Sequence, residues 1–235
     1  MDVNRLAQLA PYLALLAAVG GGRLFEMRLS RRHQRALAAR GFSREREPAF
    51  AAMVALHTAI LVGAAVEVML APRPLSPVLT TAALVAFVLA NLLRWWVIRT
   101  MAGHWNVQVV NALPLGVVTG GPFRFVRHPN YVAVFVELLA LPLVHAAYVT
   151  ALLGAAAHVV VLGRRIAFEE SFLLRDVGYR AAMGPKPRFL PRLPRPWVER
   201  RSEPPAVAAA SPRPAAQPAT QPAVKPAVQP AAIDG

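Results

Sequence analysis

The chain contains no cysteine and few charged residues. The absence of cysteine from all 235 positions excludes disulfide frameworks, thiolate zinc sites, iron–sulfur clusters and thiol nucleophiles. Charged residues make up 16% of the chain, whereas a soluble domain carries roughly 25%. Hydrophobic residues make up 56%, and the mean hydropathy is +0.42. This composition is typical of an integral membrane protein and argues against an ordinary soluble domain.

Acidic residues are also scarce. The chain has 12 Asp and Glu against 26 Lys and Arg, which gives a net charge of +14. In a soluble protein this excess would favour nucleic-acid binding. Here the arginines lie in blocks between long apolar runs, and such blocks are typical of the cytoplasmic face of a membrane protein. We therefore expect no nucleic-acid partner.

The apolar runs predict an all-α integral membrane protein with about five transmembrane helices. The first three runs cover about residues 6–27, 49–71 and 78–98. The fourth, residues 131–163, is too long for one crossing, which takes about 20 residues. Pro142 and His145 lie near its middle, so we expect a hairpin of two helices. The Arg-rich block 28–48 is expected to be a loop or a surface helix.

The distribution of arginine predicts the topology and three regions. With the N-terminus outside, the outer segments contain only Arg5 and Arg73, as the positive-inside rule requires. We expect a bacterial inner (plasma) membrane protein whose site faces the cytoplasm. Residues 1–101 would form three helices, residues 102–201 a cofactor-binding region and residues 202–235 a disordered Pro- and Ala-rich tail.

The segment GGPFRFVRHPNY, residues 120–131, carries the densest set of polar groups. Pro129 suits the first position of a helix, so His128 is predicted at the helix boundary. Free N–H groups and the positive end of the helix dipole would lie there beside Arg124 and Arg127. An anion pocket at the membrane surface is one interpretation. The other is a helix start with arginine anchors at the interface.

A second polar cluster follows the hairpin, at Arg165 and Glu169. These residues are four apart, so a surface ion pair is the simplest interpretation. The hairpin, however, returns this cluster to the same membrane surface as His128. One pocket could therefore use both clusters.

Several other polar residues fall within the apolar runs, where they are costly. Glu137 lies roughly opposite Tyr131 on the helix, so a hydrogen bond to another helix is expected. His57 and His158 are interpreted as contacts between helices or at the interface. The histidines show no metal-binding spacing, so no metal is expected. The residues also reveal no general base, and an acidic enol or a carboxylate acceptor would not require one.

The turn GGPFRFVRHPNY, the apolar hairpin and the later RxxxEE resemble the isoprenylcysteine carboxyl methyltransferase family over residues 92–191. That resemblance implies a membrane-embedded O-methyltransferase that uses S-adenosylmethionine. It places Arg165 beside the acceptor. The cofactor-binding residues that it implies are Gln108, Leu115, Gly116, Val117, Val118, Phe123, His128, Pro129, Asn130, Tyr131 and Glu169.

Two positions depart from that family's pattern. Phe123 stands where a tyrosine is common, and Val177 to Tyr179 form a shorter motif than usual after the glutamate pair. The N-terminal half, including residues 28–32 and 93–96, resembles bacterial members associated with type III polyketide synthases. This resemblance favours an alkylpyrone or alkylresorcinol acceptor over a prenylcysteine-type acceptor, which stays open, and implies association with such a synthase.

Two other functions remain open at this point. The basic face and the Pro-rich tail would suit a non-catalytic membrane protein that recruits partners. A membrane reductase that uses NADPH is the other alternative. Cofactor binding distinguishes all three, because only the methyltransferase binds S-adenosylmethionine.

Overall fold

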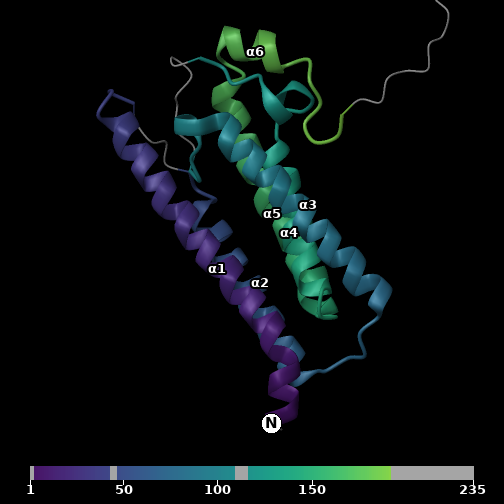
Figure 1. Cartoon of the computed structure of the whole chain (residues 1–235). Coiled ribbons are helices and arrows are strands. Elements are labelled where there is room, and N and C mark those ends of the chain that lie inside the picture. The colour runs from purple at the N-terminus through teal and green to yellow at the C-terminus, as the bar shows by residue number, and fades with distance from the viewer. Residues whose placement is uncertain (1–2, 43–46, 109–115, 192–235) are drawn as a thin grey trace, which may run out of the picture. The chain divides into compact units, whose positions relative to one another are not determined.

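The computed structural model describes residues 3–42, 47–108 and 116–191, which lie within one compact unit, Met1–Leu193. Within these ranges all regular structure is helical, as expected (Figure 1). Leu115 and the tail 202–235 lie outside the described residues. The elements are α1 (Val3–Ala38), α2 (Phe50–Leu70), α3 (Pro77–Met101), η1 (Ala102–His104), η3 (Gly121–Arg124), α4 (Pro129–Leu143), α5 (Tyr148–Leu173) and α6 (Val177–Met183).

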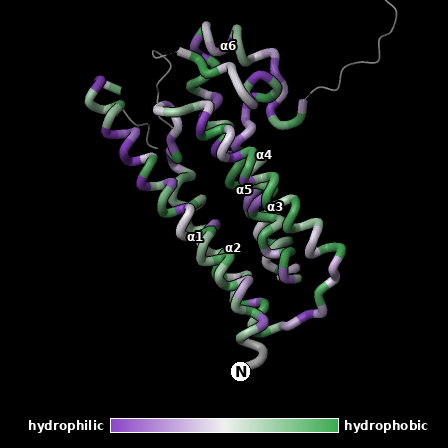
Figure 2. The backbone as a smooth tube through the Cα atoms, in the orientation of Figure 1, coloured by the Kyte–Doolittle hydropathy of each residue, from purple (hydrophilic) through white to green (hydrophobic). Residues whose placement is uncertain are grey.

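Three described helices are long and apolar enough to cross a membrane: α2, α5 and α3 with its extension to His104. Helix α4 is apolar but has only 15 residues. The protein is therefore a membrane protein, and five crossings remain a prediction. Figure 2 shows hydrophobic residues along α2, α3 and α5.

Helix α1 is longer than the first apolar run. It continues to Ala38, through much of the predicted polar block 28–48. No proline or glycine interrupts the chain between Arg23 and Ala38, so nothing in this stretch breaks the helix. The C-terminal half of α1 is consequently a polar helix.

The predicted hairpin is confirmed, because α4 and α5 are joined by a turn after Pro142. The hydroxyl of Tyr12 on α1 donates to the carbonyl of Leu141 at 3.1 Å. The carboxylate of Glu67 on α2 accepts from the backbone N–H of Thr150 at 2.7 Å. Both contacts tie this end of the hairpin to the first two helices.

Helices α2 and α5 pack closely at that same end. A Cβ at Gly154 would lie 2.8 Å from Ile60, and one at Gly63 would lie 3.3 Å from Thr150. Small residues allow such close approach between membrane helices. Further along the same two helices, the rings of His57 and His158 lie 5.6 Å apart.

A cluster of buried charges links α1, α3 and α4. Glu26 accepts from Arg94 Nε at 2.6 Å and from Arg23 Nη1 at 3.1 Å, while Arg23 also pairs with Glu137. Two arginines thus balance two glutamates, as burial of charge in a membrane protein requires. The expected contact of Glu137 with another helix is an ion pair with α1.

Candidate functional site

The turn before α4 has the local geometry that the sequence predicts. His128 is the N-cap residue and Pro129 is the first residue of the helix. Gly121 has φ +54°, and a Cβ there would overlap the side chain of Thr100. Glycine at this position therefore allows η3 to pack against α3.

Glu170 joins this turn to the segment after α6. Its carboxylate lies 3.0 Å from His128 Nε2, 3.3 Å from Arg127 Nη1 and 2.6 Å from Arg188 Nη2. The backbone N–H groups of Arg127 and His128 donate to the carbonyls of Pro187 and Arg188, each at 2.9 Å. The partner of His128 on α5 is thus Glu170. From the sequence we named Glu169 as a site residue and missed Glu170. The signal in the sequence that points to Glu170 is its position directly after Glu169.

Tyr131 stands between the other two predicted residues, Arg165 and Glu169. Its hydroxyl accepts from Arg165 Nε at 2.9 Å and donates to Glu169. The simple i, i+4 surface pair is therefore wrong as a description of Arg165, which is only 6% exposed. A bridge through Tyr131 places a cation and an anion on either side of one phenol.

The remaining contacts of Arg165 fix its guanidinium group. Nη1 pairs with Glu47 at 3.3 Å and also contacts the sulfur of Met53. Nη2 donates to the carbonyl of Val107. Residues from α2, α4 and two connecting segments thus hold one side chain.

One cavity lies beside the turn and has a volume of about 120 Å³. Eight of the predicted site residues line it: Gln108, Phe123, His128, Pro129, Asn130, Tyr131, Arg165 and Glu169. Gly116, Val117 and Val118 are not among its lining residues. The buried Oδ1 of Asn130 has no hydrogen-bond partner within the described part of the chain.

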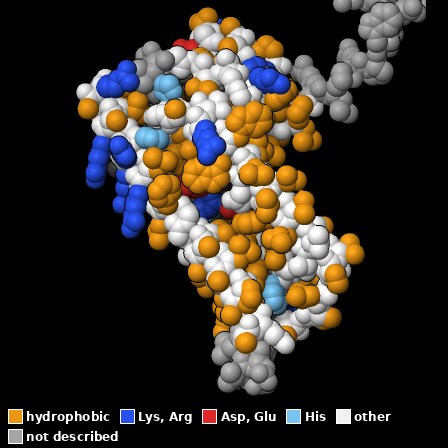
Figure 3. Space-filling model, viewed as in Figure 1, with side chains coloured by type: hydrophobic (Ala, Val, Ile, Leu, Met, Phe, Trp, Pro, Cys, Tyr) orange, Lys and Arg blue, Asp and Glu red, His pale blue; other side chains and the backbone are white. Residues whose placement is uncertain are grey.

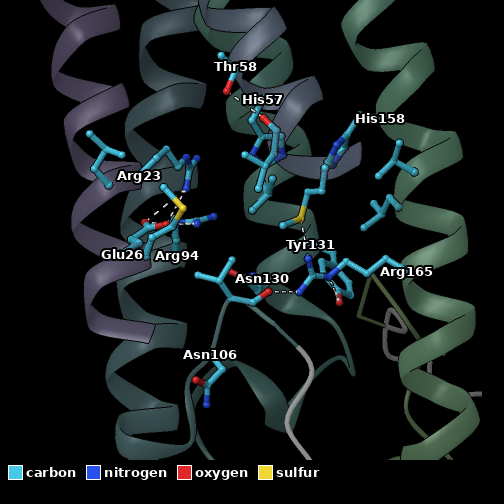
Figure 4. A pocket seen from close by; sticks show the side chains of 18 of the residues that line it. Arg23, Glu26, His57, Thr58, Arg94, Asn106, Asn130, Tyr131, His158 and Arg165 are labelled. Carbon is cyan, nitrogen blue, oxygen red and sulfur yellow. Dashed lines mark hydrogen bonds and ion pairs between the residues drawn. The ribbon is translucent and has the colours of Figure 1, made fainter. Parts of the chain in front are cut away.

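Another cavity lies among α1, α2, α3, α4 and α5 and has a volume of about 320 Å³ (Figure 4). Its wall combines apolar side chains with the buried charge cluster and two histidines. On the face shown in Figure 3, charged side chains appear in a gap in the hydrophobic surface. The two cavities share Trp105, Asn106, Asn130, Tyr131 and Arg165.

Helix α6 contains Val177 to Tyr179, the motif after the glutamate pair that is shorter than the family's usual pattern. Asp176 caps this helix by accepting from the backbone N–H of Tyr179 at 2.7 Å. Burial, and then the nearby charge of Glu169, raise the pKa of the Tyr179 hydroxyl well above its usual range. This tyrosine therefore stays neutral in the polar region at the end of α5.

Comparison with known proteins gives two findings. Residues 81–175 match the model of the Isoprenylcysteine carboxyl methyltransferase (ICMT) family, and this stretch contains the turn, Tyr131, Arg165 and Glu169. This region of the chain is therefore similar to the ICMT family. One relative of the chain is the Bacillus subtilis (strain 168) "Uncharacterized protein YpbQ", 28% identical over 160 residues, 68% of this chain and 94% of that protein. The resemblance seen in the sequence is thus confirmed over residues 81–175, and this match supports a membrane methyltransferase.

Proposed function

We propose that the protein is an S-adenosylmethionine-dependent O-methyltransferase that acts on a lipid-like acceptor. The observation that carries this proposal is the meeting of two cavities at Tyr131 and Arg165. The smaller cavity beside the α4 turn would hold the cofactor. The larger cavity among the helices would hold the acceptor.

The residues of the smaller cavity fit the cofactor's chemistry. S-adenosylmethionine supplies a methyl group bound to a positively charged sulfur, together with an amine, a carboxylate and an adenosine. Glu169 offers an anion, Arg127 a cation and Phe123 an aromatic ring, all within the same lining. The unpartnered amide oxygen of Asn130 offers a further acceptor for a donor on the ligand.

Arg165 is placed to hold the acceptor oxygen where the two cavities join. The thioether of Met53 is a weak hydrogen-bond acceptor, so an incoming oxygen can replace it at Nη1 with little loss. The other contacts of the guanidinium would keep it in place. Alignment of this kind can lower a barrier by about 7–11 kcal/mol in favourable cases.

The acceptor class follows from the larger cavity. Its apolar wall suits an alkyl or prenyl chain, and Arg165 suits a carboxylate, enol or phenol oxygen. We propose a prenylcysteine-type acceptor or an alkylpyrone or alkylresorcinol, the latter made by an associated type III polyketide synthase.

The proposed location is the bacterial plasma membrane, with the site on the cytoplasmic side. The C-terminal half of α1 carries exposed Arg28, Arg31, Arg32 and Arg35. This half lies beside the site, because His33 Nδ1 lies 2.7 Å from the carbonyl of Trp105. The positive-inside rule then supports a cytoplasmic site.

Ligand binding by the full-length protein in detergent tests the proposal. Calorimetry should show binding of S-adenosylmethionine and none of NADPH. Labelled methyl from the cofactor should then appear on a long-chain resorcinol, a long-chain pyrone or a prenylcysteine. Binding of NADPH alone would favour the reductase alternative, and binding of neither ligand would favour a non-catalytic role.

A further inference from the structure

Two histidines that line the larger cavity have buried ring nitrogens without hydrogen-bond partners among the described residues. His158 on α5 is 2% exposed, and neither of its ring nitrogens has a partner among the described residues. The same holds for Nε2 of His57 on α2. Figure 4 shows both side chains at the cavity. A buried polar group without a partner is costly, so these imidazole nitrogens are candidates for contacts with a bound molecule.

The two histidines lie on the same sides of their helices as Arg165 and its contact Met53. His158 precedes Arg165 by seven residues on α5, which is about two turns, so both side chains occupy the same stripe of the helix. On α2, His57 follows Met53 by four residues, and the sulfur of Met53 contacts Arg165. The imidazoles and the guanidinium therefore face one cavity.

Helix packing alone does not explain the two histidines. The close contacts of α2 with α5 are made by Gly63 with Thr150 and by Gly154 with Ile60. At the position of His158, an apolar side chain would also fill the space beside Phe135, whose ring lies 6.1 Å away. Such a side chain would leave no nitrogen unpaired.

We propose that His158, with His57 beside it, binds the hydroxyl group of a phenol lipid, which is not ionised at neutral pH, and accepts its proton during methyl transfer. The inference rests on the proposed function and narrows its acceptor class. A neutral imidazole has one nitrogen that accepts a hydrogen bond and one that donates. A carboxylate acceptor is already ionised and would need no such group.

The step is balanced in atoms and charge. The acceptor oxygen forms its bond to the methyl carbon as the carbon–sulfur bond breaks, and the electron pair stays on sulfur. The hydroxyl proton moves to an imidazole nitrogen. The positive charge lost from sulfur is thus regained on the imidazole, so the total charge of the buried site stays constant.

The charged groups around the cavity permit this transfer. Arg23, Arg94 and Arg165 all face the cavity and would by themselves repel an imidazolium. Each is paired with a carboxylate: Arg23 and Arg94 with Glu26, and Arg165 with Glu47. These carboxylates reduce the repulsion, and what remains is a cost of the proton transfer.

Two alkylphenols of equal chain length provide the test. One is a plain alkylphenol, and the other carries a nitro group that makes its hydroxyl ionise near neutral pH. With full-length H158A in detergent, we expect kcat for the plain phenol to fall about a hundredfold or more, the size of a general-base contribution. The nitro compound should be methylated at a rate within about threefold of wild type. Added imidazole should restore activity on the plain phenol.

H145F is the matched control, because His145 is a half-buried histidine in the turn between α4 and α5. H158N provides a second test that does not depend on folding of the alanine variant, since asparagine keeps a hydrogen-bonding group that cannot take the proton. Equal losses on both phenols, no loss, or no rescue by imidazole would overturn the inference.

Failure of the proposed function gives a different result. Wild-type protein that methylates only carboxylates would overturn the role of His158 and leave the methyltransferase intact. Wild-type protein that neither binds S-adenosylmethionine nor transfers methyl would overturn both.

Discussion

The phenolic oxygen of Tyr131 accepts a hydrogen bond from Arg165 Nε at 2.9 Å, and the same hydroxyl donates to Glu169. Arg165 stands at the junction of the two cavities, while Glu169 lines the smaller one. Tyr131 therefore couples the group proposed to hold the acceptor to the group proposed to hold the cofactor. Its ring also stacks on His128, with centroids 5.3 Å apart.

Removal of the Tyr131 hydroxyl should impair methyl transfer without unfolding the protein. Y131F leaves Arg165 Nε and a Glu169 oxygen without this partner, at a cost of about 1–3 kcal/mol. We expect turnover to fall about tenfold or more. Turnover with labelled S-adenosylmethionine measures the effect, and Y148F, at an exposed tyrosine, is the control. Equal turnover in Y131F and wild type would show that the bridge has no part in the reaction.

The two consecutive glutamates should have separable roles. E169Q removes the anion of the smaller cavity, and we expect S-adenosylmethionine affinity to fall about tenfold, or roughly 1.4 kcal/mol. E170Q instead removes the charge shared by Arg127, His128 and Arg188. It should lower stability by about 3 kcal/mol, as expected when one partner of a buried ion pair is lost.

Calorimetry and thermal unfolding in detergent distinguish these two outcomes. A large loss of cofactor affinity in folded E170Q, together with none in E169Q, would reverse the assignment.

The sequence predicted local features well and contacts between distant segments poorly. Pro129 determines where α4 begins, and Pro142 where the hairpin turns, because proline constrains the backbone within a few residues of itself. By contrast, Arg23 and Glu137 pair across more than a hundred residues. No local pattern reports such a pair.

Arg165 illustrates the same limit within the site. Its spacing from Glu169 is a local signal and predicts only a surface ion pair. The arrangement seen in the structure depends on Met53, Val107 and Tyr131, which reach Arg165 from other segments. The burial of Arg165 therefore could not be predicted from the local sequence.

Substitution of Arg165 should separate acceptor positioning from cofactor binding. In R165Q we expect kcat for the best acceptor to fall about a hundredfold, with S-adenosylmethionine affinity within about threefold of wild type. R165K should recover part of the rate, because lysine keeps the charge and lacks the planar fork. Calorimetry and single-acceptor kinetics measure both effects.

Stability must be measured alongside, because R165Q also removes the ion pair between Arg165 and Glu47. The double variant R165Q/E47Q should regain stability and not activity. R164Q is the matched control at an exposed neighbour. Normal turnover in R165Q would show that Arg165 has only a structural role.

The turn before α4 should depend on one of its two glycines. G121A should lower stability by about 1–3 kcal/mol, because its φ of +54° is unfavourable for alanine and its Cβ would overlap Thr100. G120A has φ −80° and open space around a Cβ, so it should change stability by less than about 0.5 kcal/mol. Thermal unfolding compares the two. Equal effects would contradict the geometry of η3.

The buried ion pair between Arg23 and Glu137 should show strong coupling in a double-mutant cycle. Each single substitution, R23M or E137L, leaves one charge at membrane depth without this partner, and we expect a loss of about 3 kcal/mol or more. The double variant removes both charges, replaces them with apolar groups and leaves the pair of Glu26 with Arg94 in place. It should therefore be more stable than either single variant. Unfolding in detergent measures all four proteins. If the two single losses simply add in the double variant, the pair contributes no interaction energy, and the charge balance that we infer for the larger cavity is wrong.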